Sequence, residues 1–417
     1  MSLNTELMGI NAAQNSIDTI GNNIANMNTE GFKGSTMEFA DLIGTSLEGT
    51  SGNTLTPGQG VVASNLSQLF TEGTITQTGN PLDLAINGQG FFQMQTDRGI
   101  LYTRAGSFQV DTNGFLVDAA GDKLMGSVTP TSGSSLGAIG PLQISRSALG
   151  ATATTTLGLN VNLPTTDAAI SSGTAFNPSS ASTYDESTAT TIYDSIGTGY
   201  TLTTYFTRVS GSGTPDKWQV HWQLSDPTTG AAIASGSGPQ LTFNSAGTLT
   251  GATSGAGTTV SVATLPDGAS ALNVAYSFTG TSLTAQSFGV NAITNNGNAP
   301  GTFTGLQIDS NGQLIGQYSN GLTKTFGTIA LANFENPQGL IPMTGTFWQA
   351  SLNSGPALLG APNTQGLGTL QSGALEGSNV DLSTQLVSLI VAQQAFQANA
   401  QAISYEQQNI QHLLNIQ

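Results

Sequence analysis

The chain has 417 residues and no cysteine, so it is long enough for roughly two to four domains and uses neither disulfides nor thiolate metal sites. Only 8% of the residues are charged, and 24 acidic against 8 basic side chains give a net charge of −16. Nucleic acid and anionic membranes bind clustered Lys and Arg, whereas the basic residues here are scattered singly, which argues against both as partners.

The first residues predict a helix with a narrow apolar stripe. Apolar side chains recur every seven positions, with a second row three positions further on, which is the spacing of a coiled-coil seam. Ser2 is a suitable N-cap, and a run of Asn and Thr predicts that the chain leaves the helix between Asn28 and Gly31. The helix should span about 25 residues, or roughly 40 Å. The predicted seam comprises Leu3, Ile10, Ile17 and Ile24, with Ala13, Ile20 and Met27.

Two segments with different patterns follow. Residues 31–72 are irregular and rich in glycine, which indicates an extended connector. Between Ile75 and Gly126, short apolar runs alternate with Gly and Asn turns, as expected of short β-strands.

One short unit recurs in the chain. Residues 108–117 contain Asp111-Thr-Asn-Gly114 between two apolar runs, and residues 306–315 repeat the pattern, with a looser copy at 241–249. Each copy predicts a hairpin whose turn glycine has a positive φ. The Asp-x-Asn-Gly core is also compatible with a calcium loop, but the third ligand position and the later glutamate of an EF-hand are missing. We therefore prefer a structural turn.

Residues from about 150 to 290 are rich in Thr, Ser, Gly and Ala, with alternating runs and frequent turn signals that favour an inserted β-sandwich or barrel. After Gly301 the earlier β-pattern returns. The simplest topology is therefore nested, with the middle β-domain built from both sides of the insert and with the two ends of the chain brought together.

The carboxyl-terminal residues predict a second helix. Ser378-Asn-Val-Asp381 fits a capping box, and neither Gly nor Pro follows, so the helix could extend about 35 residues, or roughly 50 Å. Because isolated helices with narrow stripes are marginal in water, we expect the two helices to pair with each other and with neighbouring copies. The second seam comprises Leu382, Leu389, Phe396, Ile403 and Ile410, flanked by Leu386 and Leu414.

Together these patterns predict a mainly β, nested multi-domain protein with terminal α-helices that pair as a coiled coil. The predicted parts are a helical domain (1–30 and 378–417), extended connectors (31–72 and 354–377), a β-rich middle domain (73–148 and 291–353) and an inserted β-rich outer domain (149–290).

No set of residues predicts catalysis, a cofactor or a metal. His221 and His412 stand alone, and the Asp residues between 83 and 122 fall mostly at predicted turns, where Asp accepts backbone hydrogen bonds. Gly88-Gln-Gly90 precedes a β-run rather than a helix, so it is no phosphate cradle. No apolar run approaches the roughly 20 residues that span a bilayer, so we predict no membrane insertion. The sequence also lacks the pattern of a cleaved secretory signal.

Several motifs, in order along the chain, resemble those of the bacterial flagellar rod and hook protein family. Within the family, the motifs at 329–340 and 375–381 and the long insert are similar to the hook branch rather than to the shorter rod proteins. The shared motifs are Asn22 to Lys33 (NNIANMNTEGFK), Gln77 to Gly88 (QTGNPLDLAING), Tyr102 to Phe108 (YTRAGSF), Ala392 to Ala400 (AQQAFQANA), Ile329 to Leu340 (IALANFENPQGL) and Leu375 to Asp381 (LEGSNVD).

The resemblance implies a structural subunit of the flagellar hook, a curved hollow tube that transmits torque from rod to filament as a flexible universal joint. It implies self-assembly, contacts with the distal rod, the hook cap and the hook–filament junction proteins, and export by the flagellar type III apparatus to an extracellular location without signal cleavage. Two alternatives remain open from the sequence: a straight, distal rod-type axial protein and, in a different class, a secreted β-rich adhesin or enzyme.

Overall fold

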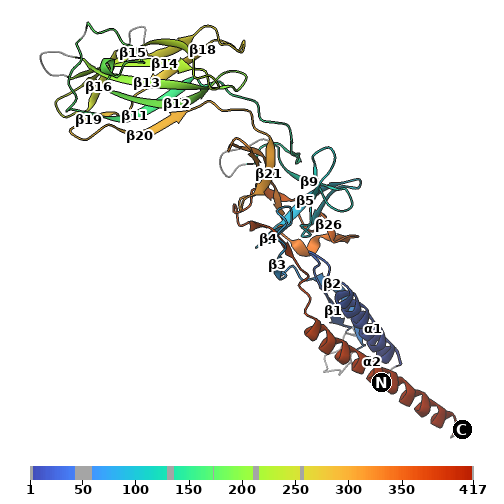
Figure 1. The fold of residues 1–417 in the computed structure, drawn as a ribbon. Helices are drawn as coiled ribbons and strands as arrows, with labels where there is room; N and C mark the ends of the chain where they lie inside the picture. The colour runs from blue at the N-terminus through green and yellow to red at the C-terminus, as the bar shows by residue number, and fades with distance from the viewer. Residues whose placement is uncertain are drawn as a thin grey trace. The chain divides into compact units, whose positions relative to one another are not determined.

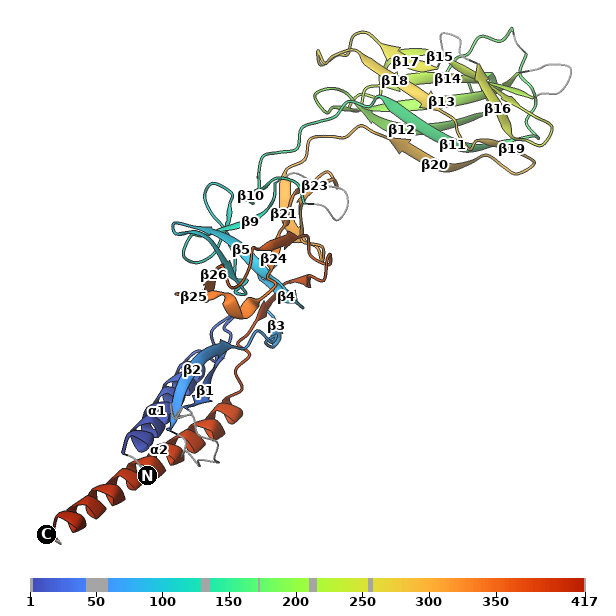
Figure 2. The same cartoon turned by 180° about the vertical axis from the view of Figure 1, so that it is seen from behind.

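The computed structural model describes residues 3–42, 59–128, 136–171, 173–209, 216–253 and 258–415. Within these ranges the chain is mainly β, with a long helix near each end (Figures 1 and 2). The predicted fold class is therefore confirmed. The chain forms two compact units, of which the first comprises Met1–Arg146, Gly305–Gln317 and Thr323–Gln417, and the second Ser147–Thr304 and Tyr318–Leu322.

The first helix, α1 (Leu3–Ala25), ends earlier than its sequence predicts. The side-chain amide of Asn26 donates to the carbonyl oxygen of Asn22 at 3.0 Å, so it competes with the backbone for the bonds that would extend the helix. A turn follows, and Gly31 has the positive φ (+65°) that the Asn- and Gly-rich run suggests.

The second helix, α2 (Leu382–Leu414), begins after a different cap from the predicted one. The Asp381 carboxylate accepts a hydrogen bond from the backbone N–H of Thr384 at 2.8 Å, so Asp381 is the N-cap. Ser378 is not a capping-box residue, because its hydroxyl oxygen accepts from the N–H of Val380 instead. The capping-box prediction was therefore wrong by three residues.

The predicted amino-terminal connector is not an extended segment. Its described residues form an antiparallel hairpin of β1 (Ser35–Asp41) and β2 (Val61–Gln68), which packs against α1. The alternation of polar and apolar residues in both strands is weak and the glycines are numerous, so the local pattern did not reveal the pairing.

The predicted carboxyl-terminal connector also joins sheets. Its three short strands pair with β24 (Leu331–Asn333), β4 (Leu84–Asn87) and β3 (Ile75–Gln77) respectively. The last two strands before α2 therefore run antiparallel to segments from the amino-terminal half of the chain. These strands are β27 (Leu358–Gly360), β28 (Thr369–Ser372) and β29 (Ala374–Glu376).

The remaining strands of the first unit form the middle β-domain, whose main sheet draws on both sides of the insert. Strands β5, β9 and β23 lie in one continuous hydrogen-bonded series, and Phe92, Met94 and Leu124, which lie on β5 and β9, are fully buried. The strands are β3 (Ile75–Gln77), β4 (Leu84–Asn87), β5 (Phe91–Thr96), β6 (Gly99–Thr103), β7 (Gln109–Val110), β8 (Leu116–Val117), β9 (Lys123–Ser127), β10 (Ile139–Pro141), β21 (Phe303–Ile308), β22 (Gln313–Tyr318), β23 (Thr323–Ile329), β24 (Leu331–Asn333), β25 (Ile341–Met343) and β26 (Phe347–Gln349).

The second unit contains two five-stranded sheets, so the insert is a β-sandwich. Trp218, Phe206 and Phe243 are fully buried in its core. The prediction placed this domain at 149–290, whereas the compact unit extends to Thr304. Its strands are β11 (Thr156–Pro164), β12 (Glu186–Tyr193), β13 (Gly199–Val209), β14 (Lys217–Ser225), β15 (Ala232–Phe243), β16 (Leu249–Thr253), β17 (Thr259–Val262), β18 (Leu272–Ser277), β19 (Ser282–Thr284) and β20 (Gly289–Asn295).

The recurrent hairpin unit has the same hydrogen bonds in each copy. The Asp111 carboxylate accepts from the backbone N–H of Asn113 at 2.9 Å and of Phe115 at 2.7 Å, and Asp309 repeats the pattern. In the looser copy, the amide oxygen of Asn244 accepts the equivalent pair. The turn therefore needs an oxygen acceptor rather than a charge, and the prediction of structural turns is confirmed.

Candidate functional site: a helical pair and its neck

The large apolar residues of the predicted seams are half-buried or exposed in the isolated chain. On α1, Ile10, Ile17, Ile20 and Ile24 are half-buried, as is Met27 just beyond its end, while the side chain of Leu3 lies outside the described residues. On α2, Leu389, Phe396 and Ile403 are half-buried, and the others are exposed. The exposed set is Leu382, Leu386, Ile410 and Leu414.

Small residues bring the two helices together instead. Ala13 and Ala392 are the buried apolar residues of the described helix positions, at 7% and 8% exposure. At Gly9 an added Cβ would lie 2.9 Å from the side chain of Asn399, so the helices approach closely at this glycine. Ala13 belongs to the predicted seam, whereas Gly9 does not, although its four-residue spacing from Ala13 is a signal for this line.

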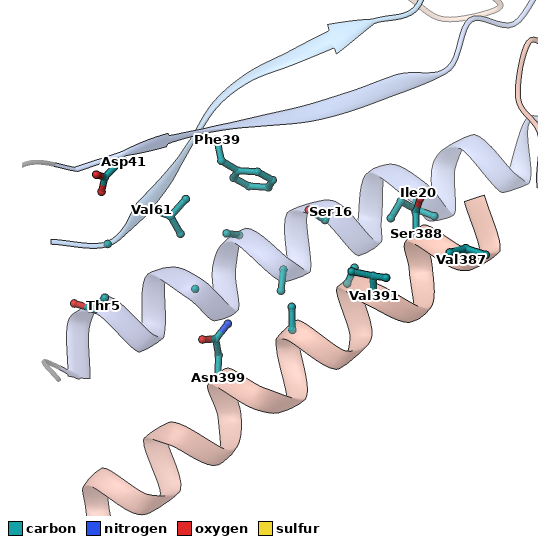
Figure 3. Close-up of a pocket in the computed structure, with 16 residues that line it drawn as sticks. Thr5, Ser16, Ile20, Phe39, Asp41, Val61, Val387, Ser388, Val391 and Asn399 are labelled. Atoms are coloured by element: carbon teal, nitrogen blue, oxygen red, sulfur yellow. The ribbon is translucent and has the colours of Figure 1, made fainter. Parts of the chain in front are cut away.

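A groove runs between α1, α2 and the β1–β2 hairpin (Figure 3). Its volume is about 890 Å³, and its lining consists mainly of apolar and small side chains. Phe39 lies on the hairpin side, and Val387 and Val391 lie on the α2 side (Figure 3). These three side chains are 40%, 62% and 59% exposed, so the groove presents an apolar surface to solvent.

Residues 31–35, 69–74 and 373–380 connect the helical pair with the middle β-domain, and we call them the neck. A buried ion cluster lies there. The Lys33 ammonium is 2.6 Å from one carboxylate oxygen of Glu376, and the Arg104 guanidinium is 3.0 Å from the other. The side chains of Lys33 and Glu376 are fully buried, and that of Arg104 is 5% exposed.

Backbone groups add hydrogen-bond partners to each charge, although the buried Nε of Arg104 has none. The Lys33 ammonium also donates to the carbonyl oxygen of Thr71 at 2.7 Å, and Arg104 donates to that of Gly88 at 2.6 Å. Glu376 accepts the N–H of Gly73 at 2.9 Å. Burial lowers the pKa of Lys33, and the Glu376 carboxylate opposes this shift. The cluster thus satisfies charges that would be costly to bury alone.

Two asparagines extend the network from the cluster to the helices. Asn23, on α1, accepts the N–H of Ser35 at 2.9 Å and donates to the carbonyl oxygen of Ser35 at 2.8 Å, and it also donates to Gln385 on α2 at 3.3 Å. Asn379 accepts the N–H of Gly34 at 2.8 Å and donates to the carbonyl oxygen of Leu69 at 2.6 Å. In the neck, the side-chain amides of these asparagines therefore make the backbone hydrogen bonds that a neighbouring strand makes within a sheet.

Close backbone crossings explain the glycines of the neck. At Gly73 an added Cβ would lie 2.0 Å from the carbonyl oxygen of Gly377, and at Gly31 it would lie 2.4 Å from the backbone nitrogen of Ala105. The N–H of Gly31 also donates to the backbone oxygen of Glu376 at 2.8 Å. The two passages of the chain can cross here because these positions carry no side chain.

Aromatic side chains pack beside the cluster. The ring of Phe70 lies 5.6 Å from that of Phe91 and 5.7 Å from that of Trp348, in edge-to-face arrangements. The Trp348 indole N–H donates to the side-chain oxygen of Gln68. The guanidinium of Arg104 lies over the Phe91 ring at 5.5 Å. The neck is therefore held by ions, amides and aromatic contacts together.

Lys33, Arg104 and Glu376 lie inside the motifs that carry the family resemblance, but no role was predicted for them. Among 8 basic residues in the chain, two inside such motifs are a signal that could have identified the cluster. The two histidines lie elsewhere: the ring of His221 stacks on Phe176 at 4.3 Å, where burial lowers its pKa, and His412 is exposed on α2.

Over the described ranges, no three acidic, His or Cys side chains gather as they would around a metal ion. Neither α1 nor α2, in the part of each that the structure describes, has the length and apolarity needed to cross a lipid bilayer.

Profiles of four protein families match the chain, and together they cover most of it. They are the flagella basal body rod protein (residues 3–33), the flagellar hook protein FlgE/F/G D1 domain (85–168), the flagellar basal body protein FlaE D2 domain (159–298) and the flagellar basal body rod FlgEFG protein C-terminal region (371–416).

Full-length relatives have the same name in several bacteria. The chain is 37% identical over 435 residues to the flagellar hook protein FlgE of Escherichia coli, with complete coverage of both chains. It is 30% identical over 432 residues to the FlgE protein of Brucella suis, covering 99% of this chain and 98% of the other. The crystal structure of Helicobacter pylori flagellar hook protein FlgE2 has a similar fold, with a TM-score of 0.56 at 16% identity, covering 72% of this chain and 100% of that one.

Proposed function

The chain belongs to the flagellar hook protein family and is a structural subunit of the bacterial flagellar hook, and from this premise we propose that copies of it polymerise through α1 and α2. In this proposal the seam residues are the assembly interface. They are half-buried or exposed in a single chain because neighbouring copies complete their burial.

The observation that carries the proposal is the exposure of large apolar side chains along α2. They form one group near the start of the helix and a smaller one near its end, and exposed apolar groups of this kind are typical of interaction sites. Complete burial of one such side chain is worth about 1.5–3 kcal/mol, so several together could drive association. The large apolar side chains of α2 that are between 38% and 69% exposed are Leu382, Leu386, Val387, Ile390, Val391, Tyr405, Ile410 and Leu414.

We propose that the carboxyl-terminal end of α2 from a neighbouring copy binds in the groove. Helix α2 has 33 residues and α1 has 23, so roughly 15 Å of α2 has no α1 beside it. In Figure 2 this unaccompanied end is the carboxyl-terminal one. It carries Ile410 and Leu414, which are 45% and 69% exposed. The apolar side chains of this helix end are suited to the apolar lining of the groove.

In the assembled hook, the polymer would be a curved hollow tube that passes torque from the rod to the filament as a flexible joint. The proposed partners are the distal rod, the hook cap, the hook–filament junction proteins and the flagellar type III export apparatus. The chain would reach the outside of the cell through that apparatus without cleavage of a signal peptide. We propose no catalytic activity and no cofactor for it.

Electron microscopy and pelleting of the purified chain test the proposal. Wild type should form tubes, whereas removal of residues 1–27 or 381–417 should leave a folded β-core that stays in the supernatant. Phe396→Asp should block pelleting without changing the β-sheet circular dichroism, because it places a charge in the seam. Gln401→Asp, at an exposed position of the same helix, is the matched control and should still pellet. A truncated chain that still formed tubes would refute the proposal.

A further inference from the structure

The ion cluster of the neck is unusual in a chain so poor in charge. It contains two of the 8 basic residues in the sequence, each buried against the same carboxylate. The remaining ion pair of the described residues, between Arg208 and Asp216, is partly exposed on both sides. Buried ion pairs are often no more stabilising than apolar residues of the same volume, so stability alone does not explain the cluster.

The energy of the ion cluster depends on the orientation of its groups, whereas that of an apolar contact does not. Each charge has a fixed set of oxygen or N–H partners at 2.6–3.0 Å, so rotation at this point breaks a specific contact in a site that water does not reach. A purely apolar contact can slide, because its energy depends on buried area and not on orientation.

The three side chains come from the three parts that meet at the neck. Lys33 follows α1, Glu376 precedes α2, and Arg104 belongs to the middle β-domain, directly after β6. Glu376 binds both cations, so one carboxylate ties both passages of the chain to the β-domain. No other described ion pair joins these parts.

We infer that the Lys33–Glu376–Arg104 cluster is the anchor through which torque passes between the helical pair and the middle β-domain. The inference rests on the proposed function, because it assigns the cluster a place in the path of the load. Glu376 is the positioning residue: it makes no contact with another copy in this reading, but it fixes the orientation of the helices that do.

The absence of cysteine makes the anchor testable in the soluble monomer. Spin labels on Asn11→Cys in α1 and Ala119→Cys in the middle β-domain would be the only two labels, and both positions are exposed. Electron–electron double resonance then gives the distribution of distances between helix and β-domain. Glu376→Gln should broaden that distribution at least twofold, while Glu38→Gln, an exposed glutamate of β1, should leave it unchanged.

A second variant separates orientation from stability. The combined substitution Lys33→Met, Glu376→Leu and Arg104→Met replaces the cluster by apolar side chains of similar size. If the cluster is an anchor, this variant should melt within a few degrees of wild type but show the same broadened distance distribution as Glu376→Gln. If the apolar variant shows the narrow distribution of wild type, the cluster is only a packing element and the inference is wrong.

The polymer supplies the final readout. Hooks built from Glu376→Gln subunits should still pellet, because the seams are intact, and should show at least a twofold lower torsional stiffness in a bead-rotation assay. Unchanged stiffness together with an unchanged distance distribution would overturn the inference. Failure of wild type to pellet would instead refute the proposed function, since the distance measurement needs only the monomer.

Discussion

The substitution Gly31→Ala tests whether the backbone crossing in the neck holds the first unit together. Gly31 has φ +65° and Gly79 has φ +76°, so alanine at either position costs about 1–2 kcal/mol in left-handed strain. At Gly31 the new methyl group would also lie 2.4 Å from the backbone nitrogen of Ala105, whereas at Gly79 nothing lies within 4 Å. Relief of such a backbone clash costs roughly another 1–3 kcal/mol.

We therefore expect Gly31→Ala to destabilise the first unit by about 2–5 kcal/mol, and Gly79→Ala by about 1–2 kcal/mol. Native-state hydrogen exchange, read by mass spectrometry on peptides from the neck and from the middle β-domain, measures both losses in the full chain. The substitution at Gly31 should also expose the N–H that bonds to the Glu376 carbonyl, so local protection in residues 31–35 should fall first. If the two variants lose equal free energy, the crossing adds no constraint beyond φ, and the reasoning fails.

Three further outcomes are expected. Asp111→Ala should cost about 1–2 kcal/mol in urea unfolding while Asp111→Asn costs little, because the turn needs only an oxygen acceptor; a calcium-dependent loss in both would contradict this. Burial first, and then the charges of Asp167 and Asp185, raise the pKa of Glu186, so the second unit loses stability as pH rises from 4.5 through that raised pKa. Glu186→Gln should therefore raise the free energy of unfolding by less than about 1 kcal/mol at pH 7 and leave it unchanged at pH 3. An equal increase at both pH values would show that the direction of the pKa shift is wrong. Gly9→Leu should separate α1 from α2 and so lower the helix content measured by circular dichroism. Gly21→Leu should not, since nothing lies within 4 Å of a Cβ added at Gly21.

Local chemistry determined much of the fold. The seven-residue stripes placed both helices, because helical periodicity depends on neighbours three and four positions apart. The Asp-x-Asn-Gly units gave hairpins in the right places, because the acceptor, the turn and the positive φ all lie within five residues.

Tertiary structure decided what distant segments do to one another. Residues 31–72 gave no clear strand signal, and the β1–β2 hairpin gains its stability by packing against α1. Asp381 rather than Ser378 caps α2, because Asn379 between them is held by Gly34 and Leu69. These partners lie more than 300 positions away in the sequence, beyond the reach of any local pattern.

The neck shows most clearly how contacts between distant residues escape prediction from local sequence. Lys33 and Glu376 are separated by 343 positions, and Arg104 by 272 from the same carboxylate. The sequence determined that the two ends of the chain are helical and meet through a nested β-domain. Only the tertiary structure decided that they meet on one buried carboxylate, because the energy of that contact depends on charge, distance and exclusion of water, none of which has a periodicity along the chain.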